Sequence, residues 1–168
     1  KASAYWKDTI FLVVADHDIR VRGDTLVPIE RFHIPGLILG ADIQPNTITA
    51  IASQIDLPVT VLSLMGISAQ HPMTGQDLSK IPENYLGRAM MQYNYNFAWM
   101  EQTGEVNGGS SNNVTVLREG KPAAFGVYDM QNKQLIETAA PANAKEIEQR
   151  ALANSLMPTL LYTEQRYR

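Results

Sequence analysis

The hydrophobic residues in the first half of the chain come in short continuous runs. Residues 9–15 (TIFLVVA) form one run and residues 32–39 (FHIPGLIL) a second. A continuous rather than alternating run is typical of a strand covered on both faces, as in the parallel sheet of an α/β fold. A helix is expected from Asp56, which would be its N-cap, with Pro58 in the first turn and Gly66 as the stop signal.

The second half of the chain has a different pattern. Residues 89–100 (AMMQYNYNFAWM) alternate aromatic and polar positions, as a half-exposed strand does. Residues 114–118 and 123–129 flank Glu119-Gly120-Lys121-Pro122, which indicates a hairpin with a longer turn. Residues 133–137 are a candidate for one more strand.

The chain is expected to end in a helix over residues 144–157, which Pro158 would interrupt or kink. We therefore expect a single unit over residues 1–168. Its α/β part, with a parallel-type sheet segment, would span residues 1–80. A small antiparallel meander and the terminal helix would form residues 81–168.

Composition narrows the class of protein. The 168 residues are 45% hydrophobic and 18% charged, which is typical of a globular domain. The net charge of −3 gives no electrostatic reason to expect nucleic acid as a partner. With no cysteine, disulfides, zinc–thiolate sites and a cysteine nucleophile are excluded. The chain lacks an initiator Met and starts almost directly on a hydrophobic strand, which suggests a piece of a longer protein.

Asp16 and His17 directly follow the first hydrophobic run. Ligands of open α/β sheets gather just beyond the carboxyl ends of strands. A carboxylate beside an imidazole can chelate a divalent cation, because each offers a lone pair. The alternative is that Asp16 only starts a turn and His17 is only an exposed side chain.

Three basic residues lie close to this pair in the sequence. Arg20 and Arg22 could clamp a phosphate or sulfate, since guanidinium groups match tetrahedral oxyanions. They could equally be solvated loop arginines. His33 starts the next expected strand and could reach the same cleft as a ligand or proton carrier. The alternative for His33 is an ordinary packing role.

Four ordered segments resemble the sulfatase and alkaline phosphatase superfamily. They are T-I-F-L-V-V-A-D-H, H-I-P-G-L-I-L-G, S-Q-I-D-L-P-V-T-V-L-S-L-M-G-I and H-P-M-T-G-Q-D-L. The first resembles the strand that delivers an Asp-His pair to the metal of that superfamily. The lack of an Asp-His-Gly sequence and the basic loop after the pair look more like its phosphoglycerol transferase branch, the enzymes similar to lipoteichoic acid synthase.

The resemblance implies a C-terminal fragment of an alkaline-phosphatase-like catalytic domain. Asp16 and His17 would bind Mn²⁺, Mg²⁺, Zn²⁺ or Ca²⁺, and Arg20, Arg22 and His33 would contact the substrate. The Thr or Ser nucleophile lies upstream in that family and is absent from this chain, so the fragment alone is expected to be inactive. The full enzyme would act on phosphate or sulfate esters, lipid- or glycan-linked, outside the bacterial inner membrane. It would be anchored there by a missing N-terminal segment and face the periplasm or the cell exterior.

Two other interpretations remain open. Tyr93, Tyr95, Phe97 and Trp99 would share one face of a strand, where they could stack on a glycan in a non-catalytic binding module. Cross-strand packing explains the same spacing. The fragment could also form a homodimer through an apolar face that its missing half would otherwise cover.

Overall fold

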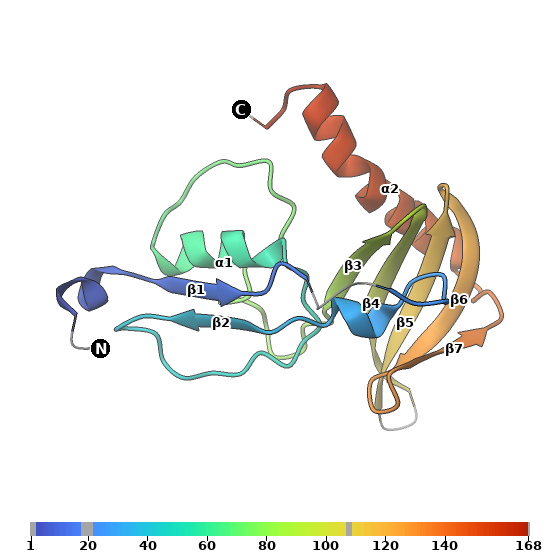
Figure 1. Cartoon of the computed structure of the whole chain (residues 1–168), viewed down its shortest axis with the longest axis horizontal. Coiled ribbons are helices and arrows are strands. Elements are labelled where there is room, and N and C mark those ends of the chain that lie inside the picture. Colours follow the sequence, from blue (N-terminus) through green and yellow to red (C-terminus); the bar gives the residue numbers. More distant parts are fainter. Residues whose placement is uncertain (1–2, 18–21, 107–108, 168) are drawn as a thin grey trace.

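The computed structural model describes residues 3–17, 22–106 and 109–167 as a mixed α/β arrangement with two sheets (Figure 1). In chain order the elements are the 3₁₀ helix η1 (Ala4–Asp8), β1 (Phe11–Val14), the 3₁₀ helix η2 (Ile29–Phe32), β2 (Gly36–Leu39), α1 (Asp56–Leu64), β3 (Arg88–Tyr93), β4 (Asn96–Val106), β5 (Gly109–Arg118), β6 (Lys121–Asp129), β7 (Gln134–Thr138) and α2 (Ala144–Thr163). The β1–β2 pair and α1 lie on one side of the molecule, and strands β3 to β7 lie on the other.

Strands β1 and β2 form a two-stranded antiparallel sheet, with Phe11 opposite Leu39 and Val14 opposite Gly36. The expectation of a parallel-type segment is therefore wrong for this strand pair. Residues 22–35 form η2 beside the other sheet and lead back to β2. This described part of the connection contains no α-helical crossover of the kind that parallel neighbours need. The pair is also poorly covered, since Val13 is 57% exposed and Leu37 is 52% exposed.

Strands β3 to β7 form an antiparallel meander in sequence order. The expected hairpin between β5 and β6 is present, but its turn has only the two residues Glu119 and Gly120, both with positive φ. The single strand expected over residues 89–100 is in fact two strands, because the chain reverses at Asn94 and Tyr95. Asn94 has a φ of 53° there, a left-handed conformation that asparagine tolerates better than most residues.

Each face of the meander packs against a different segment. Ala98, Met100, Val114, Val116 and Tyr128 pack against residues of the segment that contains η2. On the other face, Trp99 and Leu117 pack under α2 around Ala151. Tyr93, Tyr95, Phe97 and Trp99 therefore do not share one exposed face, contrary to the expectation behind the glycan-binding interpretation. Trp99 is only 3% exposed, while Tyr93 packs at the opposite core.

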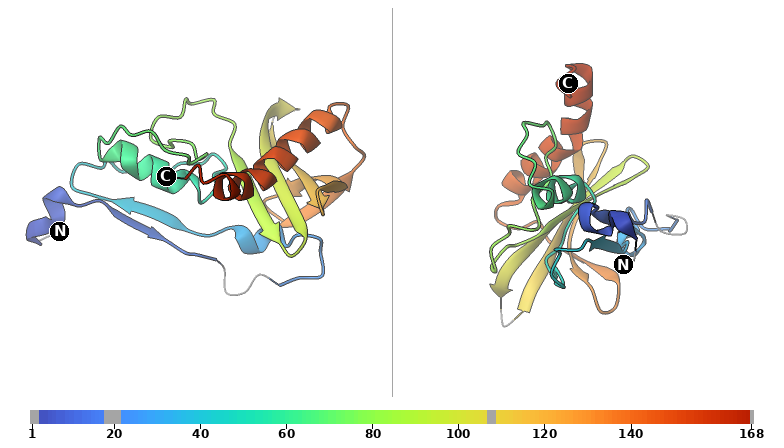
Figure 2. Two further views of the ribbon diagram at one scale, coloured as in Figure 1. Left: turned by 90° about the horizontal axis from the view of Figure 1, so that it is seen from above. Right: turned by 90° about the vertical axis from the view of Figure 1, so that its left-hand side faces the viewer.

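Helix α2 crosses the sheet and then extends beyond it, as the two further views show (Figure 2). The helix continues through Pro158 to Thr163, so the proline does not interrupt it, and a kink at this position stays a prediction. Side chains such as Leu156 and Leu160 are exposed beyond the sheet. Water can therefore reach the backbone carbonyl that loses its donor at the proline. No helix in the described part of the chain has the length and apolar character needed to cross a membrane.

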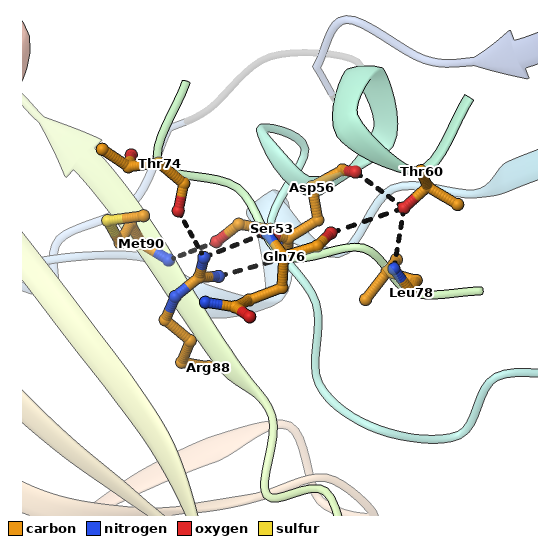
Figure 3. A network of polar contacts seen from close by, with 8 residues as sticks. All are labelled: Ser53, Asp56, Thr60, Thr74, Gln76, Leu78, Arg88 and Met90. Carbon is orange, nitrogen blue, oxygen red and sulfur yellow. Dashed lines mark hydrogen bonds and ion pairs between the residues drawn. The ribbon is translucent and has the colours of Figure 1, made fainter. Parts of the chain in front are cut away.

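A buried ion pair joins α1 to the meander (Figure 3). The two guanidinium nitrogens of Arg88 donate to the Asp56 carboxylate at 2.9 and 3.1 Å. The same carboxylate accepts the backbone N–H groups of Ser53 at 2.8 Å and Gln76 at 2.7 Å. The expectation that Asp56 is the N-cap is wrong, because α1 begins at Asp56 and Ile55 is at the N-cap position.

Hydroxyl groups extend this network on both sides. Thr60 Oγ1 donates to the Asp56 carbonyl and accepts the backbone N–H of Leu78 at 2.9 Å. Ser53 Oγ accepts the backbone N–H of Met90 in β3 at 3.0 Å. The loop before α1, the loop after it and the edge strand of the meander are thus held together by one set of contacts.

Candidate metal centre

The carboxyl end of β1 is held from two sides. The Ala15 N–H donates to the Pro35 carbonyl at 3.4 Å, and Gln54 Nε2 donates to the Ala15 carbonyl at 3.0 Å. Gln54 lies between Ser53 and Asp56, so the buried network before α1 also fixes the residue that precedes Asp16. The sequence contains no signal for Gln54, because the contact spans 39 positions.

Asp16 and His17 lie side by side just beyond this anchored point. The His17 backbone N–H donates to Asp16 Oδ1 at 2.9 Å, and His17 Nε2 lies 3.5 Å from Asp16 Oδ2. Their side chains are 88% and 62% exposed, respectively. The strand end thus presents one carboxylate and one imidazole to solvent, close enough together to bind a common ligand.

The donor set fits part of a divalent metal site. Oxygen and imidazole ligands suit Zn²⁺ and Mn²⁺, and the carboxylate also suits Mg²⁺ and Ca²⁺. Such cations take at least four ligands. Over residues 3–17, 22–106 and 109–167, no group of three His, Asp or Glu side chains is arranged to hold a metal. Asp16 and His17 can therefore supply two ligands, and the others must come from solvent or from groups outside the described residues.

The pair lines a groove of about 2180 Å³ between the β1–β2 sheet and the meander. His33 lines the same groove, together with Gln54 and Arg31, which sequence reasoning missed as a site residue. Arg22 is exposed and does not line it, and Arg20 lies outside the described residues. The groove is larger than the roughly 300–1,000 Å³ of a small-molecule site, so it has room for a substrate and for further polypeptide.

Comparisons with known proteins agree with the class that these residues indicate. Residues 1–67 match the family model described as Sulfatase, and this range contains Asp16, His17 and His33. The chain is also similar to a protein in the alkaline phosphatase superfamily from Vibrio parahaemolyticus, whose crystal structure is known. The match has 41% sequence identity and a TM-score of 0.85, and it covers 98% of this chain.

These similarities support the alkaline phosphatase superfamily and a sulfatase-like fragment, as the four sequence segments predicted. The match covers 38% of the Vibrio protein, so the present chain spans well under half the length of that relative. Most of the fold of the relative has no counterpart here.

Proposed function

We propose that this chain is the C-terminal part of the catalytic domain of a metal-dependent phosphoglycerol transferase or sulfatase. The observation that carries the proposal is the Asp16–His17 pair, anchored at the carboxyl end of β1 and open to the large groove. The Sulfatase match over residues 1–67 supports it.

In this proposal Asp16 and His17 hold the divalent metal, which would be Mn²⁺, Mg²⁺, Zn²⁺ or Ca²⁺. The metal supplies Lewis acidity, which lowers the pKa of a hydroxyl nucleophile and neutralises ester oxygens. Gln54 keeps the strand end in position through the Ala15 carbonyl. His33 lines the groove, where it would contact the substrate.

The remaining parts of the site lie outside this chain in the proposal. A Thr or Ser nucleophile and the missing acidic ligands would come from an upstream segment. That segment would cover the exposed face of β1 and β2 and connect to membrane-spanning helices. The catalytic domain would then act at the outer side of the bacterial inner membrane on lipid- or glycan-linked esters. Arg20 and Arg22 remain predicted oxyanion contacts from the basic loop.

Titration of the isotope-labelled chain with Mn²⁺ tests the metal site. Paramagnetic broadening of NMR signals is expected first at residues 15–17 and near Gln54. Asp16→Asn and His17→Gln should each weaken this broadening about tenfold or more, since each removes one of two ligands. Asp24→Asn and His71→Gln change exposed residues of the same types and serve as matched controls.

Two results would contradict the proposal. One is broadening that is as strong at His71 as at His17, or that the Asp16 and His17 variants leave unchanged. The other is metal-dependent phosphodiester or sulfate-ester turnover by the 168-residue chain alone. Such turnover would show that the nucleophile does not come from elsewhere.

A further inference from the structure

A second, smaller pocket lies between η2 and the turn that joins β6 to β7. Its volume is about 450 Å³, within the roughly 300–1,000 Å³ typical of small-molecule sites. It is lined by Glu30, Arg31, His33, Tyr128, Met130 and Lys133. Four of these residues also line the large groove, so the two cavities adjoin.

The η2 side of this pocket is firmly held. Ile29 is buried in the core beneath the meander, next in sequence to the two lining residues Glu30 and Arg31. Asn96 Nδ2 donates to the Leu26 carbonyl at 2.7 Å and ties the preceding segment to β4. These contacts leave little freedom for the backbone that presents Arg31 and His33.

The turn side of the pocket is also ordered by its own contacts. The Asp129 carboxylate accepts the backbone N–H groups of Gln131 at 2.8 Å and Asn132 at 2.9 Å, and the Asn132 side chain at 2.8 Å. Lys133 follows with a φ of 53°, in the left-handed region. The same hydrogen bonds engage the Asp129 carboxylate within the turn and lower its pKa.

Three of the residues that line the pocket, Arg31, His33 and Lys133, have basic side chains that can donate to an anion. Among the residues that line the pocket, Glu30 carries a carboxylate. Its Oε1 lies 3.3 Å from Arg31 Nε, so the two side chains form an ion pair. Within the described residues, no carboxylate lies in ion-pairing distance of the Lys133 ammonium group. His33 adds a further donor. Its protonation would give the pocket an excess positive charge, because Arg31 and Lys133 are otherwise balanced by Glu30 and the nearby Asp129.

Tyr128 supplies a neutral donor among the residues that line the pocket. Its side chain is buried, and burial raises the pKa of the phenol, with further contributions from the carboxylates of Glu30 and Asp129. The hydroxyl group therefore remains protonated at neutral pH and can donate a hydrogen bond.

We propose that this pocket binds a tetrahedral oxyanion, a phosphate or sulfate group. The substrate would carry this group at a position away from the ester that reacts in the groove. Lys133, His33 and the Tyr128 hydroxyl would be the donors, and Arg31 would add positive charge at the rim. The identification of the ligand as part of a substrate rests on the proposed function, whereas the oxyanion chemistry rests on the pocket alone.

NMR titration of the labelled 168-residue chain with inorganic phosphate tests the pocket, without added metal. Saturable shifts are expected at His33 and at residues 130–133. Lys133→Gln should weaken binding about tenfold through loss of a charge-assisted contact, and Lys133→Arg should restore most of it. Lys121→Gln, at an exposed lysine at the start of β6, is the matched control and should change nothing.

Glycerol phosphate separates a substrate-borne group from free phosphate. Binding of the ester at least as tight as that of inorganic phosphate supports the proposal, because the adjoining groove has room for the alcohol. Ester binding that is tenfold weaker would assign the pocket to free phosphate and overturn the substrate assignment. Shifts that never saturate would mean an adventitious ion only and overturn the proposal of an oxyanion site. Equal losses of phosphate affinity in the Lys133 and Lys121 variants would mean the same.

The two proposals can fail separately. Phosphate binding that depends on Lys133, together with no specific Mn²⁺ effect at Asp16 and His17, would retain the oxyanion pocket and reject the enzymatic function. Specific Mn²⁺ binding without phosphate binding would reject the pocket alone.

Discussion

Replacing Arg88 with methionine should destabilise the fold strongly, because it breaks the buried ion pair with Asp56. Asp56 is fully buried and the Arg88 side chain is only 13% exposed. In Arg88→Met the carboxylate keeps the backbone N–H groups of Ser53 and Gln76 but loses both guanidinium contacts. The Asp56 carboxylate is then a buried negative charge without its cationic partner.

The magnitude can be worked from these contacts. Breaking a buried ion pair by removing one partner destabilises a protein by about 3–5 kcal/mol. Typical domains have a free energy of unfolding of about 5–15 kcal/mol, so the variant would lose about a fifth or more of its stability. Arg88→Lys should lie between the wild type and Arg88→Met, because an ammonium group keeps the charge but cannot bind both carboxylate oxygens in the same way.

Urea unfolding followed by circular dichroism measures the effect, with the midpoint converted to free energy by linear extrapolation. Arg118→Met removes an exposed arginine from β5 and should change stability by less than about 0.5 kcal/mol. Combining Asp56→Asn with Arg88→Met should destabilise less than the sum of the single changes, since the uncompensated charge is gone. An Arg88→Met midpoint equal to that of Arg118→Met would refute the assignment of this pair as the principal link between α1 and the meander.

Two further predictions concern other contacts of the same region. Asp77 has a pKa below its ordinary 3.8, because hydrogen bonds from Ser63 and Ser79 outweigh the upward effect of burial. The ionised Asp77 therefore stabilises the fold above pH 3.8, and this contribution is lost as the pH falls through the lower pKa of the folded state. Asp77→Asn should be less stable than the wild type by about 1 kcal/mol at pH 7. Equal unfolding midpoints of the two proteins at pH 7 would contradict this. A Cβ atom at Gly87 would lie 1.9 Å from the Ile51 carbonyl oxygen, so Gly87→Ala should lower the thermal midpoint by several degrees, whereas Gly104→Ala, with nothing within 4 Å, should not.

Local signals predicted the helices and the second half of the sheet well. Helix α1 begins at Asp56 and is followed by Gly66 with a φ of 70°, as the proline and glycine positions indicated. The hairpin at Glu119 and Gly120 followed from its turn residues. The reversal at Asn94 was missed because the alternation of tyrosine and asparagine continues through the turn and conceals it. The turn is visible only once β3 and β4 are paired.

Non-local features could not be predicted in the same way. The antiparallel pairing of β1 with β2 depends on the path of the connection through η2, which hydrophobic runs do not encode. The adjacency of Asp16 and His17 follows from the sequence, but the support from Gln54 and the place of Arg31 in the groove depend on chain folding. The partner of Asp56 is likewise 32 positions away.

The hydrophobic pattern of β1 was interpreted as a strand buried on both faces, yet side chains such as Val13 are largely exposed in this chain. The present chain spans only 38% of the relative from Vibrio parahaemolyticus, and on the proposed function a further segment would cover this strand. Burying apolar surface stabilises a folded protein by about 25 cal/mol per Å². The apolar side chains of β1 would therefore favour a further segment that covers them. On the proposed function, that segment would also bring the missing metal ligands to Asp16 and His17, since both lie at the end of the strand it covers. Packing of β1 and completion of the metal site would then be a single event, and a polypeptide that fails to bury Val13 should also fail to strengthen Mn²⁺ binding at His17.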